Sequence, residues 1–373
     1  MDNETEKIII RGFYSTRGAC IVNQRIWFTT CLNNYLCFID IDKDDYIHIA
    51  TELPEYGNNT DLYMKMLFYE NFLILIPSTS NVITLYYLES KELKHIPIRN
   101  FIRSKDKKIA NLQDSWFSSA FIYKGFLYLL PQFYPEFVSL NLENFQLSYY
   151  GKNELRKLSS NTIEDKYWFF RSISIDDKYA YSPLYNSNYI CRYDLNMHTR
   201  EYIQVPSDAL ISAAIKVQEG FLYSDRKEHC LKLFNQISKT ENKIISIANC
   251  RISNEPCYTN IYRVGENIVY IPERSRFIYV INEQDFSNIY KLCICEGVDD
   301  NIAYAWLEDK NNIWFVCLDS QTIKHYNSNF ECVKEIQIDQ IEIKRKDINK
   351  HLSLINESDK FNLQDFLDVY IQI

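Results

Sequence analysis

The chain has 373 residues, of which 46% are hydrophobic and 24% are charged, as in an ordinary globular protein. Its formal net charge of −8 disfavours general binding to nucleic acid or to anionic membranes. No run of 18 apolar residues occurs, so the sequence predicts no membrane-spanning helix.

The cysteines and the N-terminus indicate a compartment. The 11 cysteines are odd in number, and Cys37, Cys191 and Cys317 stand inside apolar runs, which is typical of reduced core residues. The N-terminus is acidic and lacks the basic and long apolar regions of a secretory signal. We therefore expect a cytoplasmic protein, and its richness in Asn, Ile, Lys and Tyr is typical of an AT-rich bacterial genome.

Residues 258–292 show the unit on which the chain is built. Three short apolar runs, Ile261–Val264, Ile268–Ile271 and Phe277–Ile281, are followed by a weaker fourth, Asn288–Leu292. Polar turns of a few residues separate these runs. The pattern predicts a four-stranded antiparallel meander.

The same unit recurs along the chain. The second strand of each unit is expected to begin at one of seven positions that are 42 to 54 residues apart: Ile26, Leu73, Leu127, Tyr179, Phe221, Ile268 and Ile313. Fourteen or fifteen residues later, six of the seven units carry a turn-forming Asp or Asn: Asp40, Asn141, Asp194, Asn235, Asn282 and Asn327. Four residues after the start, four units carry a proline that ends a strand: Pro77, Pro131, Pro183 and Pro272.

A period of this length with four strands in each unit predicts a β-propeller. The predicted fold is all-β: a single seven-bladed propeller of four-stranded antiparallel blades over residues 1–338, with six or eight blades as alternatives. The expected inner strands are Ala19–Val22, Met64–Phe68, Ser118–Tyr123, Ser172–Ile175, Ala213–Val217, Ile261–Val264 and Ala303–Leu307.

The third strand and the turn that follows it, as in FIYVINEQDFSN and ICRYDLNMHTRE, resemble the repeats of quinoprotein-like and YncE-like propellers. This resemblance covers roughly residues 15–338 and implies the propeller fold. The chain lacks the Gly-Gly pair of kelch blades and the Gly-His and Trp-Asp pairs of WD40 repeats. The resemblance therefore implies no function.

Some segments depart from the repeat. Residues 98–114 and 151–166 lengthen two links and are expected to be surface loops. The tail, residues 339–373, has apolar residues at 363, 366, 367 and 370, a spacing that predicts a short helix packed on the propeller. The run Ile8–Ile10 is expected to add an outer strand to the last blade and to help close the ring.

The sequence shows no catalytic or cofactor motif. No P-loop, GxGxxG, GxSxG or HExxH pattern occurs, and the six histidines lack metal-ligand spacing. We therefore predict no cofactor and no metal.

Candidate binding residues follow from position in the predicted ring. The first strand of each blade lines the central channel, and the loops before it share one face with the loops after the second strand. Residues expected near this mouth to bind a ligand are Arg17, Lys65, Ser119, Arg171, Ser212, Asn260, Arg274, Tyr304 and Trp306. A ring of acids is expected around them: Asp61, Asp114, Asp165, Asp208, Glu255 and Asp300.

Two functions fit this pattern. The first is a non-catalytic binding module or scaffold that engages a protein partner or a small polar or anionic ligand, with no nucleic acid and no membrane as partner. The alternative is a glycan-active hydrolase or lyase in which mouth carboxylates act together with Lys65 and Arg171. Two carboxylates facing each other across the channel would favour hydrolysis, whereas acids splayed into solvent would favour binding.

Arg171 is the candidate residue whose role depends most on the strand phase. If the strand phase is right, its guanidinium faces the channel, and if the phase is off by one, Phe170 takes its place. A channel-facing Arg171 either braces neighbouring inner strands or clamps a carboxylate or phosphate.

Overall fold

The computed structural model describes residues 19–29, 35–43, 46–54, 62–99, 116–132, 134, 136–151, 169, 172–184, 187–246, 260–272, 275–297, 302–317, 320, 322–337 and 342–343. Of Tyr46, Ala303, Tyr304, Glu342 and Ile343 it describes only the backbone. The expected helix in the tail and the run Ile8–Ile10 lie outside these residues. No helix long and apolar enough to cross a membrane occurs in this part of the chain.

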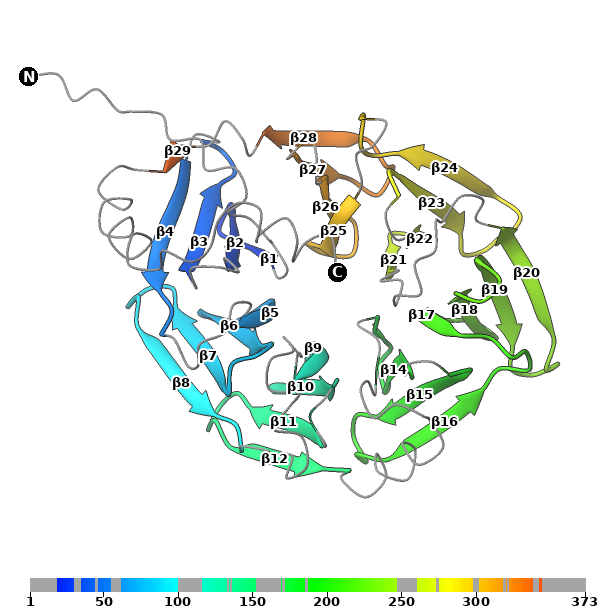
Figure 1. The fold of residues 1–373 in the computed structure, drawn as a ribbon, viewed down its shortest axis with the longest axis horizontal. Helices are drawn as coiled ribbons and strands as arrows, with labels where there is room; N and C mark the ends of the chain where they lie inside the picture. The colour runs from blue at the N-terminus through cyan, green and yellow to red at the C-terminus, as the bar shows by residue number, and fades with distance from the viewer. Residues whose placement is uncertain are drawn as a thin grey trace, which may run out of the picture.

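Seven antiparallel sheets stand around a central axis, which confirms the seven-bladed propeller and excludes six or eight blades (Figure 1). The first four blades are β1–β4 (Ala19–Val22, Arg25–Thr29, Tyr35–Asp40, Tyr46–Glu52), β5–β8 (Tyr63–Tyr69, Phe72–Pro77, Val82–Tyr87, Leu93–Pro97), β9–β12 (Phe117–Tyr123, Phe126–Pro131, Phe137–Asn141, Leu147–Tyr150) and β13–β16 (Ser174–Ile175, Tyr179–Pro183, Tyr189–Asp194, Arg200–Gln204). The last three are β17–β20 (Ile211–Val217, Gly220–Asp225, Cys230–Asn235, Glu241–Ser246), β21–β24 (Asn260–Val264, Asn267–Ile271, Phe277–Asn282, Ile289–Cys293) and β25–β28 (Ile302–Leu307, Ile313–Cys317, Thr322–Tyr326, Cys332–Gln337).

The predicted turn residues form the turns by the expected mechanism. The side-chain oxygen of Asn282 accepts hydrogen bonds from the backbone N–H groups of Gln284 and Asp285, at 2.8 and 3.2 Å. Asn141, Asp194 and Asn235 make the same pair of bonds in their own blades, and Asn327 accepts from the backbone N–H groups of Asn329 and Glu331. A short polar side chain that bonds its own backbone therefore ends the third strand in five blades.

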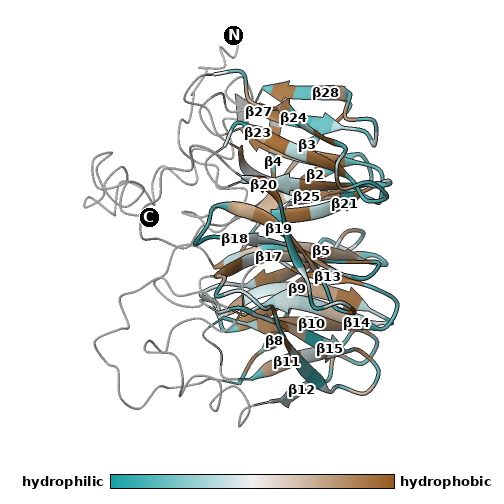
Figure 2. Ribbon diagram, turned by 90° about the vertical axis from the view of Figure 1, so that its right-hand side faces the viewer, coloured by the Kyte–Doolittle hydropathy of each residue, from teal (hydrophilic) through white to brown (hydrophobic). Residues whose placement is uncertain are grey.

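The core is divided into seven apolar clusters, one between each pair of neighbouring blades. Each sheet is therefore buried on both faces, which is why a second strand such as β6 is a continuous apolar run, FLILIP. Figure 2 shows these apolar strand residues in brown and the more polar turns between them in teal. The cysteines predicted to lie in the core, Cys37, Cys191 and Cys317, are all buried.

Neighbouring inner strands are joined by side chains because each inner strand is a sheet edge with unpaired backbone groups. Tyr262 donates its hydroxyl proton to the carbonyl oxygen of Ala305 in the next blade, at 2.9 Å. Between two other blades, the hydroxyl oxygens of Ser172 and Ser174 accept bonds from backbone N–H groups of β17.

A strand beyond residue 338 belongs to the first blade. Strand β29 (Glu342–Ile343) pairs in parallel with β4, so that Glu342 lies opposite Tyr46 and Ile343 opposite Ile47 (Figure 1). The tail thus links the last blade to the first, and the propeller extends past the boundary expected from the repeat.

Candidate ligand-binding site at the channel mouth

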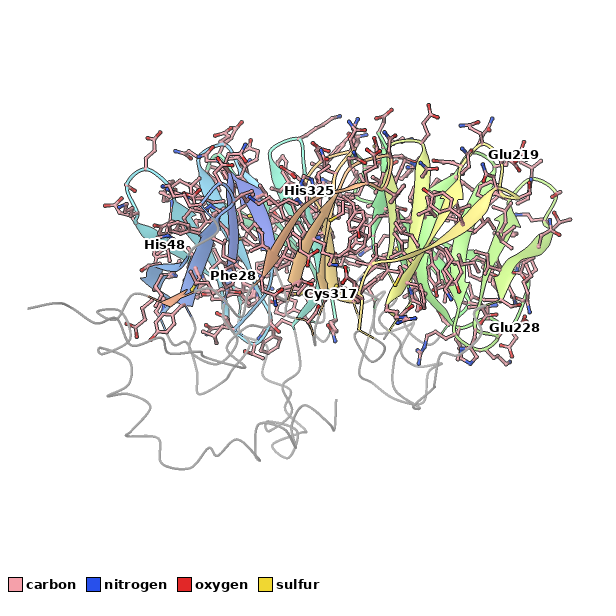
Figure 3. All side chains as sticks on the ribbon, turned by 90° about the horizontal axis from the view of Figure 1, so that it is seen from above. Phe28, His48, Glu219, Glu228, Cys317 and His325 are labelled. Carbon is pink, nitrogen blue, oxygen red and sulfur yellow. The ribbon has the colours of Figure 1, made fainter. Side chains whose placement is uncertain are left out.

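The two faces of the ring differ in the connections they carry. We call the turn face the side with the short turns between first and second strands, and the mouth face the side where inner strands begin. Figure 3 shows Glu219, in a turn of the fifth blade, on one face of the disc and Glu228, between β18 and β19, on the opposite face. The predicted ligand-binding residues belong mainly to the mouth face.

A β-bulge recurs at the mouth end of the inner strand. The pairing of first and second strands skips one residue in four blades, at Met64, Ser118, Ser212 and Ala303. A bulge turns the side chains that follow it relative to those before it. The bulge therefore affects which side chains of the inner strand face the mouth.

Beyond the bulge, the predicted positions are structurally equivalent from blade to blade. Lys65 pairs with Ile76 and Ser119 with Leu130, each three residues after the predicted start of its second strand. Asn260 occupies the same place in the sixth blade, opposite Ile271. In the last blade the equivalent residue is the predicted Tyr304, opposite Val316.

Lys65 is a partly buried cation in the wall of the channel. Its ammonium group donates a hydrogen bond to the carbonyl oxygen of Ala120 in the next inner strand, at 2.9 Å. Within the described ranges no ion pair joins it to a carboxylate. Burial alone lowers the pKa of Lys65 to about 8, because desolvation disfavours the charged form.

The other described candidates are held in different ways. Ser212, the bulge residue of the fifth blade, is buried and its hydroxyl lies 2.6 Å from that of Ser224. Ser119 is 2% exposed, and none of the described residues forms a hydrogen bond with its hydroxyl. Trp306 lies near the turn-face end of β25, where its ring stacks on Trp314 at 6.2 Å, so it is remote from the mouth.

Several predicted residues cannot be placed. Arg17, Arg171 and Arg274 lie outside the described residues, and so do five of the six acids expected around the mouth, Asp61, Asp114, Asp165, Glu255 and Asp300. The sixth acid, Asp208, has a side chain that is 91% exposed and paired with Lys227. The hydrogen bond from Lys227 lowers the pKa of Asp208.

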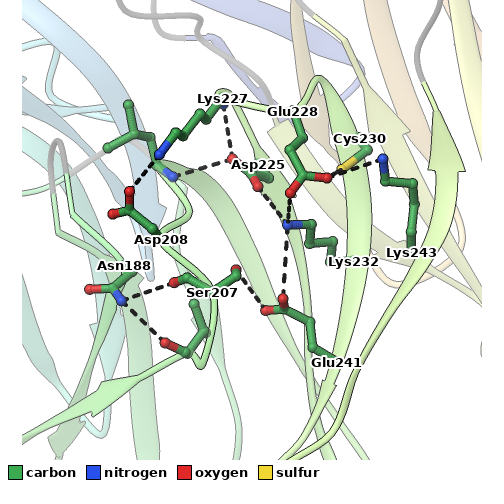
Figure 4. Close-up of polar contacts among 12 residues, drawn as sticks. Asn188, Ser207, Asp208, Asp225, Lys227, Glu228, Cys230, Lys232, Glu241 and Lys243 are labelled. Carbon is green, nitrogen blue, oxygen red and sulfur yellow. Dashed lines mark hydrogen bonds and ion pairs between the residues drawn. The ribbon is translucent and has the colours of Figure 1, made fainter.

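The repeat gave no indication of a buried lysine between the fourth and fifth blades. Lys232 is 4% exposed, and its ammonium group lies 2.8 Å from carboxylate oxygens of both Asp225 and Glu228 (Figure 4). A third carboxylate, that of Glu241, lies 3.8 Å away. Burial by itself lowers the pKa of Lys232, but the bonds to Asp225 and Glu228 outweigh it and raise the pKa above its ordinary value. The one sequence signal is a lysine inside the apolar run CLKLF.

Three residues of this cluster have side chains that can bind a metal ion. Their ligand atoms, in Asp225, Glu228 and Cys230, lie within 4.8 Å of one another. The ammonium group of Lys232 already binds both carboxylates at hydrogen-bond distance. Lys243 adds a second ammonium group 3.1 Å from Glu228, and these two lysines lower the pKa of Glu228 to about 2. We therefore interpret the cluster as an ion-pair network that joins β18, β19 and β20.

Comparisons with known proteins agree on the fold and on nothing finer. No protein-family model matches the sequence, and no curated protein matches it either. Among solved structures, virginiamycin B lyase from Staphylococcus aureus is similar over 80% of this chain and 90% of its own, with a TM-score of 0.56 and 13% identity. A chain of the mitotic checkpoint complex has a TM-score of 0.56 over 86% of this chain and 93% of its own, with 9% identity.

A computationally designed protein, Ika8, is similar over 89% of this chain and 90% of its own, with a TM-score of 0.53 and 10% identity. A lyase, a component of an assembly and a designed protein thus share this architecture. At such low identity the likeness shows a propeller and assigns no activity.

Proposed function

We propose that this propeller is a non-catalytic binding module that takes a small anionic ligand at the mouth face, with Lys65 as its charged contact. The observation that supports this proposal is the ammonium group of Lys65 in the channel wall. Among the described residues, its hydrogen-bond acceptor is a single backbone carbonyl oxygen, that of Ala120. An ammonium group has three protons to donate, and a buried charge is costly without a counter-charge. An anion in the channel would supply that counter-charge.

A hydrogen bond that only joins two neighbouring inner strands does not require a charged donor such as the ammonium group of Lys65. The sixth blade joins its inner strand to the next blade with the neutral hydroxyl of Tyr262, which donates to the carbonyl oxygen of Ala305 at the same distance of 2.9 Å. A neutral donor therefore does the same structural work without the desolvation cost that lowers the pKa of Lys65. A ligand that binds the ammonium group of Lys65 would explain why the protein carries this desolvation cost.

What favours binding over glycan cleavage is the state of Asp208. Hydrolysis of a glycosidic bond requires two carboxylates about 5–9.5 Å apart that face each other across the bond. Asp208 extends into solvent and is neutralised by Lys227. The likeness to a lyase is one of fold, and Asp208 is the only acid of the expected ring that lies among the described residues.

The test compares Lys65→Met with the wild-type protein in the presence of defined anions. Inorganic phosphate, succinate, citrate and galacturonate are added at about 10 mM, and the shift in unfolding temperature is measured. We expect at least one anion to stabilise the wild-type protein and to lose that effect in Lys65→Met. The matched control is Lys216→Met, because Lys216 is also a partly buried inner-strand lysine with a lowered pKa but bonds the carbonyl oxygen of Val217 at the turn face.

Stabilisation by the same anion that persists in Lys65→Met would overturn the proposal, as would the absence of any effect in the wild-type protein. Release of reducing sugar or of an unsaturated product from an oligogalacturonide would instead support the enzymatic alternative.

A further inference from the structure

The two most exposed large apolar side chains among the described residues lie on the turn face, in neighbouring blades. Met197 is 70% exposed and Ile237 is 79% exposed. They stand in the turns between the third and fourth strands of the fourth and fifth blades, which are adjacent in the ring (Figure 1). Phe68 and Leu307, also on this face but in the second and last blades, are only 39% and 38% exposed.

The turn itself does not require an apolar residue. In the third and sixth blades, both residues whose N–H groups bind the turn-forming oxygen are polar. They are Glu143, Asn144, Gln284 and Asp285. In the fourth and fifth blades, one of the two is Met197 or Ile237. Exposed apolar groups that gather on one surface are typical of interaction sites.

Two more apolar side chains extend this surface. Phe126, at the start of β10 in the third blade, is 37% exposed, and Ile175, at the end of β13 in the fourth, is 39% exposed. Lys124, two residues before Phe126, donates a hydrogen bond to the side-chain oxygen of Asn196 at 3.3 Å. Because Asn196 directly precedes Met197, this bond brings the turns that carry Phe126 and Met197 together.

Both exposed turns are held by side-chain hydrogen bonds. The carboxylate of Asp194 accepts a bond from the backbone N–H of Met197 at 2.9 Å. In the fifth blade, Asn235 accepts from the N–H of Ile237 at 2.9 Å and donates to the carboxylate of Glu219 at 2.6 Å. A turn that is already fixed loses little conformational freedom when its apolar side chain is buried by a partner, which lowers the cost of binding.

The charges around these side chains indicate what the partner is. The turns of the fourth and fifth blades expose both signs: the acids Asp176, Asp177 and Glu219 and the cations Lys178 and Lys239. The turns of the sixth blade, in contrast, expose acids alone. In a contact about a two-fold axis a surface meets its own copy, so a surface of one sign repels itself. A surface with both signs can place its carboxylates against the ammonium groups of the other copy.

We propose that two copies of this chain associate through the turn faces of their fourth and fifth blades, with Met197 and Ile237 at the centre of a two-fold contact. Phe126 and Ile175 would lie beside them, and the exposed charges would form the polar rim that such interfaces have. The mouth face is on the opposite side of the disc, so both channel mouths would remain open. The contact does not involve Lys65 and is therefore independent of the function proposed above.

The experiment measures the mass of the protein by sedimentation velocity between about 5 and 200 μM. We expect the wild-type protein to form a dimer with Kd on the order of 10 μM. Met197→Asp and Ile237→Asp each place a charge where the contact excludes water, and each should weaken the dimer at least about tenfold. Both side chains are exposed in the single chain, so the unfolding temperature of the variants should remain that of the wild-type protein.

The matched control is Val333→Asp. Val333 is also an exposed apolar residue, at 52%, but it stands on β28 of the last blade, away from the fourth and fifth blades. This change should leave Kd unchanged. A wild-type protein that is monomeric at 200 μM would overturn the proposal. So would an assembly larger than a dimer, a dimer that Met197→Asp/Ile237→Asp does not weaken, or equal weakening by Val333→Asp.

Discussion

The ammonium group of Lys334 donates a hydrogen bond to the carbonyl oxygen of Ile41, although the two residues are 293 positions apart in the chain. Lys334 belongs to β28 of the last blade, and Ile41 follows β3 of the first. The apolar cluster between these blades contains Ile26, Phe28, Trp314 and Ile323. The ring is therefore closed by side-chain packing, by this bond and by the parallel pairing of β29 with β4.

A chain that ends at residue 337 should be less stable than one that ends at residue 344, because only the longer chain retains β29. The loss of its few ladder hydrogen bonds should lower the free energy of unfolding by about 1–2 kcal/mol, measured by urea denaturation. The comparison cancels any effect of residues 345–373, which both chains lack. Equal stabilities would show that β29 contributes nothing to closure.

Lys232→Met should destabilise the protein severely. The carboxylate of Asp225 is buried, and without the ammonium group it is left as an uncompensated charge, which costs about 3–5 kcal/mol. Lys243→Met is the control, because its ion pair with Glu228 is half exposed and should change stability by no more than about 0.5 kcal/mol. The double variant Lys232→Met/Asp225→Asn should recover part of the loss. A single-variant effect equal to that of Lys243→Met would contradict the network.

Lys65 should make stability rise with pH above neutrality. Its pKa is about 8 in the folded protein and about 10.5 when the chain is unfolded, so between these values the unfolded state binds more protons. From pH 7 to pH 10 the free energy of unfolding of the wild-type protein should rise relative to Lys65→Met by on the order of 1–3 kcal/mol. The measurement is urea denaturation of both proteins across this range. Parallel pH profiles would show that Lys65 is not desolvated.

The turn after β23 depends on one acceptor oxygen. Asn282→Ala removes the oxygen that binds two backbone N–H groups and should cost about 1 kcal/mol in the free energy of unfolding. Asn282→Asp retains an acceptor in the same place and should be nearly neutral. If both variants lose the same stability, the side-chain bond does not hold the turn.

The repeat could be predicted because its signals are local. An Asn or Asp that bonds the N–H groups two and three residues further on needs no distant partner, so Asn235 and Asn282 mark the end of the third strand in any context. A proline that ends a strand acts in the same way, as Pro77 and Pro131 do at the ends of β6 and β10. Two local markers in phase were enough to count the blades.

The polar clusters could not be predicted, because their partners come from different elements. Lys232 stands in β19, while its carboxylates come from β18, from the loop before β19 and from β20. The backbone of Arg99 is bound by the hydroxyl groups of Tyr149 and Tyr134, which come from the third blade and which no local pattern around Arg99 indicates.

The bulges at Met64, Ser118 and Ser212 have a consequence for how the mouth can vary. Each takes up one extra residue inside an inner strand, while the second and third strands of the same blade remain in continuous register. The blades touch one another chiefly through the apolar clusters between them, and bonds such as that from Lys65 to Ala120 join only neighbouring blades. The side chains at each bulge can therefore vary while the sheet of that blade keeps its register, so the residues presented to a ligand can change in one blade at a time.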